Sequence, residues 1–256
     1  MDDLGLKIVS GTWSPGYIID VDALESELGV SRTVVREAIK VMTSKGLIAA
    51  RPKFGTYVRD RLEWNLLDAD VMSWRDTGRP DPDLIRDLNE MRRILEPAAA
   101  RLAAHRRSPG EIDAIETALA GMESADVDRH VESDLLFHRT LLSATHNELL
   151  SRLEVVLKMA MSIRDRLAFG GPHSDGFMDL HRAVAAAVKQ GDPDEAERAM
   201  YALLNAAEKD SAALLQAGNG APAKNAMGKR RVSAVPGTSP QTVTGRAARP
   251  KPRPAG

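Results

Sequence analysis

The stretch that decides the fold is Leu28-Gly29-Val30-Ser31-Arg32-Thr33-Val34-Val35-Arg36-Glu37-Ala38-Ile39. A run from Val21 to Leu28 with apolar residues at helical spacing stops at Gly29, and Ser31 opens a second run that reaches Met42. Gly29 suits the left-handed position that ends a helix, and Ser31 can accept a backbone N–H as the N-cap of the next helix. The pattern predicts a helix, a tight turn and a second helix.

Cationic side chains mark the beginning of the second predicted helix. Arg32, Thr33 and Arg36 lie in its first turns, opposite Val34 and Val35, so that long cationic side chains project from its exposed end. A recognition helix presents itself to the major groove of DNA in this way. The alternative is an amphipathic helix pair whose arginines merely face solvent.

The residues after the second helix favour DNA binding. Gly46-Leu47-Ile48 ends that helix, and Ile48–Arg51 and Phe54–Val58 are typical of two short strands around a tip. A helix-turn-helix followed by a β-hairpin is a winged helix. We therefore predict a winged helix-turn-helix DNA-binding domain over residues 1–60.

Short motifs along this domain resemble those of the GntR family of bacterial transcription regulators. They are Ile8-Val9-Ser10-Gly11, Pro15-Gly16, Val30-Ser31-Arg32-Thr33, Arg36-Glu37-Ala38 and Gly55-Thr56-Tyr57-Val58. The resemblance implies that a homodimer binds a palindromic operator in double-stranded DNA. We expect Arg32 to contact a base edge, Ser31, Thr33 and Arg36 to hold phosphates or neighbouring bases, and Gly55 to place the wing. Asp22 departs from the family, since a carboxylate there would repel a phosphate.

The composition narrows the class of protein. The 256 residues allow one large or two modest domains, and two fit better. The absence of cysteine excludes a disulfide framework and a thiolate metal site. No apolar stretch approaches the roughly 20 residues of a membrane span, and the N-terminus lacks the basic start of a signal peptide. We expect a cytoplasmic protein without a membrane partner.

The rest of the chain is predicted to be mainly α. Residues 61–80 favour a linker helix in which Trp64 and Trp74 are packing anchors between the domains. Residues 81–215 predict an antiparallel, all-α bundle of six helices. These are Asp83–Arg106, Pro109–Met122, Val127–Thr145, Glu148–Leu167, Gly176–Gln190 and Pro193–Leu215.

Residues 216–256 form a basic tail without an acidic residue, rich in Ala, Gly and Pro. Such a composition buries too little apolar surface to fold, so we expect the tail to be disordered. It either adds non-specific attraction to nucleic acid or only keeps the chain in solution. Because the whole chain has a net charge of −1 and the tail is basic, the rest of the chain is acidic. Affinity for DNA must therefore come from the positions of a few cationic side chains and not from the net charge.

Polar residues interrupt the apolar stripes of the predicted bundle. Arg92 lies in the stripe of the first helix, Asp134 and His138 are four residues apart on the third, and His181 lies in the stripe of the fifth. Buried polar groups are costly without partners, so one shared site would account for all four. Asp134, His138 and His181 are a plausible divalent-metal triad, with Zn²⁺ the default for mixed nitrogen and oxygen ligands. The alternative is core histidines bonded to backbone carbonyls.

The same region is similar to the FCD effector domain of the FadR branch of GntR regulators. The segments that carry the similarity are Glu90–Pro97, Asp134–His138, His146-Asn147 and Leu180-His181. The resemblance implies that Asp134, His138 and His181 bind a metal, which holds a small carboxylate effector. Leu203 stands where the family has its last histidine, leaving at most three protein ligands and open coordination positions. His130 is expected to be exposed near the start of its helix.

The linker from Trp64 to Trp74 is similar to that of repressors of D-galactonate and related sugar-acid catabolism. The resemblance implies an aldonate effector that weakens DNA binding. We expect Arg92 to anchor its carboxylate and Glu96 to pair with Arg92 when the effector is absent. The alternatives are a metal-dependent enzyme acting on a small hydroxy acid, for which no general base is evident, and a DNA-architectural protein whose bundle only dimerises.

Overall fold

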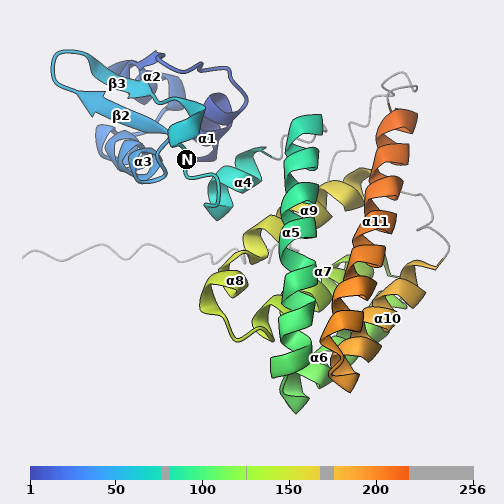
Figure 1. Ribbon diagram of the computed structural model, residues 1–256. Coiled ribbons are helices and arrows are strands. Elements are labelled where there is room, and N and C mark those ends of the chain that lie inside the picture. The colour runs from blue at the N-terminus through green and yellow to red at the C-terminus, as the bar shows by residue number, and fades with distance from the viewer. Residues whose placement is uncertain (76–80, 125, 168–175, 219–256) are drawn as a thin grey trace, which may run out of the picture. The chain divides into compact units, whose positions relative to one another are not determined.

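The structure, a computed structural model, describes residues 1–75, 81–124, 126–167 and 176–218 (Figure 1). It is mainly helical with one small sheet, which confirms the predicted fold class. We call residues 1–58 the winged helix. Its elements are α1 (Asp2–Val9), β1 (Ile18–Ile19), α2 (Val21–Leu28), α3 (Arg32–Ser44), β2 (Ile48–Arg51) and β3 (Gly55–Val58).

Capping residues and a glycine set the ends of the two helices in the helix-turn-helix. The Asp20 side chain accepts hydrogen bonds from two backbone N–H groups and so caps α2. Gly29 ends α2 with φ 63°, in the left-handed region predicted for it. Ser31 is the N-cap residue of α3, but its exposed side chain makes no capping hydrogen bond, so that part of the prediction is wrong. Solvent can satisfy the first N–H groups of α3 at this exposed position.

One apolar residue of α3 lies on the opposite side from the predicted one. Val35 is 1% exposed and packs in the core, whereas Val34 is 52% exposed. Successive residues of an α-helix point about 100° apart, so the narrow buried face takes Val35, Ala38 and Met42 and leaves Val34 out. Val34 therefore lies on the exposed surface of the helix together with the cations.

The sheet has the order β1-β3-β2, with both pairs antiparallel. Strands β2 and β3 form the predicted hairpin, in which Ile48 pairs with Val58. The two-residue strand β1 was not predicted, because two residues carry no periodicity; Ile18 pairs with Tyr57. Gly55 begins β3 with φ 97°, a conformation that side chains with a Cβ rarely adopt.

The linker is less helical than predicted. A 3₁₀ turn over Arg61–Glu63 is followed by extended backbone at Trp64, and the helix α4 covers only Ala69–Arg75. The Asp68 side chain accepts hydrogen bonds from the N–H groups of Asp70 and Val71, and this fixes where α4 begins. Residues 76–80 of the predicted linker lie outside the described residues.

Of the two linker tryptophans, Trp74 lies in the core of the winged helix and the partly buried Trp64 packs against that core, which corrects the prediction that they lie between the domains. Trp74 is 4% exposed, and a Cβ on Gly5 of α1 would come within 2.3 Å of its ring. Its Nε1 donates a hydrogen bond to Asp2, and Nε1 of Trp64 donates to the Arg59 carbonyl. Met72, also on α4, instead packs with residues of two later helices, α5 (Pro82–Arg106) and α9 (Glu154–Leu167).

The helices that follow α4 form the bundle. They are α5 (Pro82–Arg106), α6 (Pro109–Met122), α7 (Val127–Ser143), α8 (Glu148–Arg152), α9 (Glu154–Leu167), α10 (Phe177–Gln190) and α11 (Pro193–Gly218). The predicted helix over Glu148–Leu167 is two helices, because Leu153 leaves the helical conformation with ψ 4° and ends α8. The last helix continues to Gly218, beyond the predicted end at residue 215. The rest of the predicted tail lies outside the described residues.

The main core of the bundle is apolar and draws on five helices. α5 packs along α11, as Figure 1 shows, α6 packs against α7, and α10 packs against α11. Phe137, Leu141 and Val184 lie in this core, each at most 2% exposed. Among the helices of the described ranges, none combines the length and the apolar character that a membrane span needs.

Candidate functional site

Five of the residues singled out in the bundle meet in its interior. Arg92 and Glu96 come from α5, Asp134 and His138 from α7, and His181 from α10. Their side chains are each at most 5% exposed. We call these five residues the polar cluster. Arg92 and Glu96 lie one turn apart on α5, and Asp134 and His138 lie one turn apart on α7, because each pair is four residues apart. The packing of α10 against these helices adds His181 to the group.

The contacts form a chain through the polar cluster. Nε of Arg92 donates a hydrogen bond to Glu96 Oε1 at 2.5 Å, and Nδ1 of His138 donates to Glu96 Oε2. Oδ1 of Asp134 lies 3.5 Å from Nε2 of His138 and 3.1 Å from Nε2 of His181. Glu96 therefore joins Arg92 to the histidines, and Asp134 lies between the two imidazoles.

The hydrogen bond at Nδ1 of each imidazole, on the side away from Asp134, determines which ring nitrogen carries the proton. Nδ1 of His181 contacts the Phe177 carbonyl at 2.9 Å, and Nδ1 of His138 contacts the Glu96 carboxylate. Both partners only accept, so each Nδ1 must carry the proton. A neutral imidazole then offers a lone pair on Nε2. Lone pairs of two imidazoles and a carboxylate oxygen converge on one point, an arrangement that calls for a cation, either added protons or a metal ion.

The electrostatics agree with an ionised carboxylate at the centre. Burial alone would raise the pKa of Glu96, but the charges of Arg92 and His138 outweigh burial and lower it to about 2. Burial alone would lower the pKa of His138, but Glu96 and Asp134 raise it above its usual value. Burial dominates at His181 and lowers its pKa. Glu96 thus stays charged at neutral pH, and the two histidines differ in proton affinity.

The donor set fits a divalent metal. Asp134, His138 and His181 each offer a ligand atom within 4.8 Å of the others. Ligand atoms about 2.0–2.2 Å from a tetrahedral Zn²⁺ lie roughly 3.4 Å apart. The separations of 3.1 and 3.5 Å are close to that value. Leu203 is 2% exposed in the apolar core and carries no donor atom, so these three residues would leave a coordination position open.

His130 is not where the sequence was expected to put it. It is buried, with 8% of its surface exposed, and its Nδ1 donates to the Met122 carbonyl at 2.5 Å. Its ring also packs 5.7 Å from that of Phe177. The prediction of an exposed His130 is wrong because the first turns of α7 pack against the end of α6.

The predicted DNA-binding residues lie on the surface of the winged helix. Ser31, Arg32, Thr33 and Arg36 are all exposed on α3 or at its N-cap, and Gly55 is exposed at the start of β3. Sequence reasoning missed one contact, in which Nη2 of Arg32 lies 3.0 Å from Oδ1 of Asp22 on α2. In the sequence, only the unusual acid at position 22 pointed to this contact.

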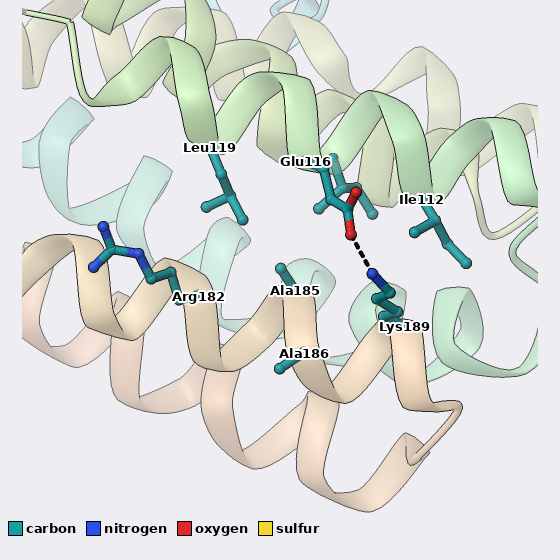
Figure 2. Close-up of a pocket in the computed structure, with 8 residues that line it drawn as sticks. Ile112, Glu116, Leu119, Arg182, Ala185, Ala186 and Lys189 are labelled. Carbon is teal, nitrogen blue, oxygen red and sulfur yellow. Dashed lines mark hydrogen bonds and ion pairs between the residues drawn. The ribbon is translucent and has the colours of Figure 1, made fainter.

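A shallow groove of about 220 Å³ runs between α6 and α10 (Figure 2). Ile115, Leu119 and Ala185 line it, and an ion pair of 2.5 Å between Glu116 and Lys189 crosses it. None of its lining residues belongs to the polar cluster. The groove is therefore a separate surface feature.

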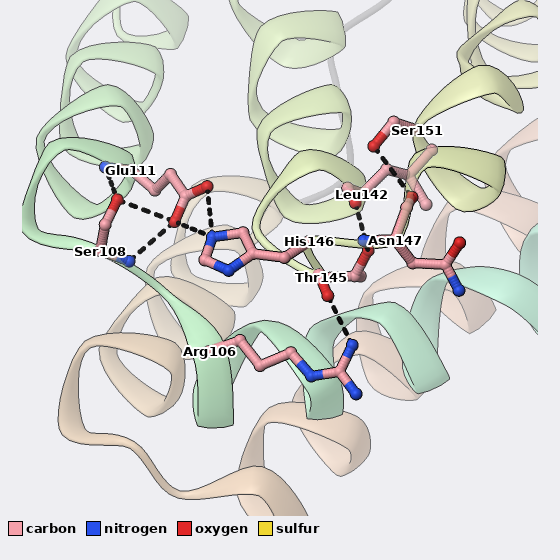
Figure 3. Close-up of polar contacts among 8 residues, drawn as sticks. All are labelled: Arg106, Ser108, Glu111, Leu142, Thr145, His146, Asn147 and Ser151. Atoms are coloured by element: carbon pink, nitrogen blue, oxygen red, sulfur yellow. Dashed lines mark hydrogen bonds and ion pairs between the residues drawn. The ribbon is translucent and has the colours of Figure 1, made fainter.

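His146 and Asn147 make contacts at the beginnings of two helices, α6 and α8 (Figure 3). Nε2 of His146 contacts Glu111 at 3.0 Å, and Glu111 forms a capping box with Ser108 at the start of α6. The Asn147 side chain caps α8. These contacts connect the loop after α7 with the beginning of α6, away from the polar cluster.

Comparison with known proteins assigns the class that the winged helix and the bundle suggest. Residues 1–58 match the model of the bacterial regulatory proteins of the gntR family, and residues 87–206 match the FCD domain. The chain belongs to the GntR family and carries an FCD domain. It is a DNA-binding transcriptional regulator, and the family gives no support to the enzyme alternative.

Relatives along most of the chain are regulators of the same kind. The galactonate operon transcriptional repressor of Escherichia coli K12 is 32% identical over 206 residues, covering 78% of this chain and 90% of the relative. The putative L-lactate dehydrogenase operon regulatory protein of the same strain is 31% identical over 188 residues, covering 71% of this chain and 72% of the relative. The solved structure of Lar, which controls the Listeria monocytogenes agr system, shares the fold with TM-score 0.56 and 19% identity, covering 84% of this chain and 97% of that one.

Proposed function

We propose that the chain represses genes of sugar-acid catabolism and that an aldonate such as D-galactonate releases it from its operator. Two of its relatives are named for operons of hydroxy acids, galactonate and L-lactate. The bundle offers a buried guanidinium next to a potential metal site, a combination suited to a carboxylate that also carries hydroxyl groups.

In the DNA-bound state, a homodimer holds a short palindrome. Arg32 contacts a guanine edge in each half-site, because a guanidinium matches the O6 and N7 acceptors of guanine. Ser31, Thr33 and Arg36 hold phosphates or neighbouring bases, and Gly55 sets the approach of the wing. A twofold axis places the two recognition helices on two half-sites. The cytoplasm is where such a regulator acts.

In the effector-bound state, Arg92 and the metal share the ligand. Zn²⁺ is the ion that we propose, held by Asp134, His138 and His181. When bound, it acts as a Lewis acid toward the carboxylate or α-hydroxyl oxygens of the effector. Arg92 turns from Glu96 to the effector carboxylate or binds both, since a guanidinium has five N–H donors. Glu96 holds His138 in both states and keeps Arg92 in place when the effector is absent.

Release from DNA requires that the effector bind one arrangement of the chain better than another. The element that we propose to differ is α4. Val71 and Trp74 of this helix pack in the core of the winged helix, and Met72 packs with α5 and α9. A change at α5 therefore reaches α4 through packed side chains.

The observation that carries this proposal is the convergence of three electron-pair donors beside the Arg92–Glu96 pair. The test is a gel-shift titration of an operator selected by the protein from random DNA, with D-galactonate, its epimers and L-lactate, in the presence and absence of a chelator. We expect one aldonate to release the DNA at the lowest concentration and the chelator to weaken that effect. Release by none of these acids would contradict the proposed effector class.

A further inference from the structure

Val34 presents an apolar side chain to solvent near the beginning of α3. It is 52% exposed, and every other exposed residue of this fully described helix is polar or charged. Val30, Ile39 and Val41 are partly buried and pack against the core of the winged helix, but Val34 is not among the described apolar residues that do so. Packing in the core therefore does not explain why residue 34 is apolar.

Valine is also an unfavourable residue for an exposed helical position. Its β-branched side chain loses rotational freedom in a helix, so it favours the helix less than alanine does. A single exposed apolar residue is common on protein surfaces. What distinguishes Val34 is its place in the first turn of α3, directly after Arg32 and Thr33.

The first three residues of α3 point in different directions around the end of the helix. Arg32, Thr33 and Val34 follow one another at intervals of about 100°. Arg32 lies on the side next to α2, since its Nη2 is 3.0 Å from Asp22. Val34 consequently lies on the other side of Thr33. A recognition helix brings the residues at its N-terminal end against base edges in the major groove, so that Arg32 and Val34 meet different bases there.

The major groove offers an apolar side chain one kind of partner. Thymine alone among the four bases carries a methyl group, at C5, on its major-groove edge. The other groups that the bases present there are hydrogen-bond donors and acceptors, with which valine cannot pair. A short, stiff side chain that ends in two methyl groups is suited to a contact that removes water from the thymine methyl group.

We propose that Val34 is a specificity-determining residue, which contacts the C5-methyl group of one thymine in each half-site of the operator. The proposal rests on the proposed role of α3 as the helix that reads bases. It adds a thymine to the guanine that we assign to Arg32. Unlike a phosphate contact, this contact distinguishes between sequences, because cytosine and the purines offer no methyl group at that place.

The test replaces each thymine of the operator that wild type selects from random DNA, one at a time, by deoxyuridine. This replacement removes the methyl group and keeps the base-pairing groups. Fluorescence anisotropy gives the affinities of wild type and Val34→Ala for every duplex. Val127→Ala is the matched control, because Val127 is 70% exposed and also lies in the first turn of a helix, α7 of the bundle.

We expect one thymine in each half-site at which deoxyuridine weakens the binding of wild type about fourfold, as the loss of one buried methyl group predicts. At that thymine Val34→Ala should lose less than about twofold, whereas Val127→Ala should lose as much as wild type. Val34→Ala should unfold at the wild-type temperature or above it, since alanine is the better helix former. Equal losses in wild type and Val34→Ala at every thymine would overturn the proposal.

Arg32→Ala, measured with base-substituted duplexes, separates this inference from the proposed function. If Arg32→Ala loses the preference for guanine while Val34→Ala keeps the full thymine response, α3 still reads bases and only the contact of Val34 is refuted. If wild type ignores every thymine methyl group and Arg32→Ala keeps the wild-type base preference, the role of α3 is wrong as well. Dissociation of a Val34→Ala dimer in size-exclusion chromatography without DNA would place Val34 against a second copy of the chain and overturn the proposal.

Discussion

Glu96 accepts a hydrogen bond from Nδ1 of His138 in the interior of the bundle, where the two side chains are 2% and 1% exposed. The contact fixes the orientation of the imidazole and directs its Nε2 toward Asp134. Glu96 also accepts from Arg92. One carboxylate therefore positions both a candidate metal ligand and the candidate effector cation, which makes it the point where the two parts of the site depend on each other.

The purified protein should hold about one divalent ion per chain. His138→Ala and His181→Ala should each lose most of it, because each removes one of the three ligands that the described part of the chain brings together. Elemental analysis of the purified proteins measures this, with His146→Ala as the control histidine, since it lies by Glu111 outside the polar cluster. Equal metal content in wild type and His138→Ala would contradict the assignment.

Glu96→Gln should weaken metal binding without removing a ligand. The amide can still accept a hydrogen bond but carries no charge, so it orients His138 less well and lowers its basicity. A loss of about 10- to 100-fold in affinity is expected from the removal of such a partner. Competition titration with a chromophoric chelator gives the affinity, and circular dichroism checks that the variant is folded. Unchanged affinity would mean that Glu96 only neutralises Arg92.

Arg92→Ala should still bind the operator but no longer respond to the aldonate. The variant removes the cation that meets the effector carboxylate and leaves the winged helix untouched. Gel-shift titration with D-galactonate measures the response. Arg93→Ala is the control, because this neighbour is exposed and pairs with Glu208. Release of Arg92→Ala at the wild-type aldonate concentration would leave Arg92 as a core ion-pair partner only.

Arg32→Ala should lose about 1–3 kcal/mol of binding to the selected operator and become tolerant at one base position of each half-site. The physical reason is the loss of a two-point contact to one base. Lys40→Ala on the same helix is the control, since that exposed lysine pairs with Glu37. Anisotropy with operators substituted base by base measures both effects. Wild-type base preference in Arg32→Ala would contradict the assignment.

The stability of α4 should depend on pH through Asp68. Burial alone would raise the pKa of Asp68, but Lys45, whose Nζ lies 2.7 Å away, and the N–H of Val71 lower it below 3.8. The unfolded chain thus takes up this proton more readily than the folded chain. The stabilisation is complete above the unfolded-state pKa and is lost as pH falls through the folded-state value.

Asp68→Asn should therefore be less stable than wild type at neutral pH by about 1 kcal/mol, and the difference should vanish in acid. Urea denaturation at several pH values between neutrality and the acid limit gives the free energies. Asp87→Asn, which removes an acid from an exposed pair with Arg86, should show a much smaller difference at neutral pH. A difference between Asp68→Asn and wild type that does not change with pH would contradict this account.

Predictions from the sequence were good where local chemistry decides the structure. Gly29 and the hairpin of the wing follow from turn chemistry and strand pattern, and both are as predicted. The predictions overlooked one local contact, the Asp68 cap, which makes the linker helix short by starting it at Ala69. They also failed where packing decides, since Val34 is exposed because the narrow buried face of α3 takes only one of two adjacent valines.

The sequence by itself determined the class of the protein and the chemical types in its site. Spacing of four residues placed Asp134 and His138 on one face of a helix, since the helical repeat is a local property. Only the tertiary structure decided which atoms meet. The Glu96–His138 hydrogen bond joins residues 42 positions apart, and the Asp22–Arg32 pair joins two helices across a turn. Such contacts depend on how whole helices pack, which is a sum over many side chains and is encoded in no single motif.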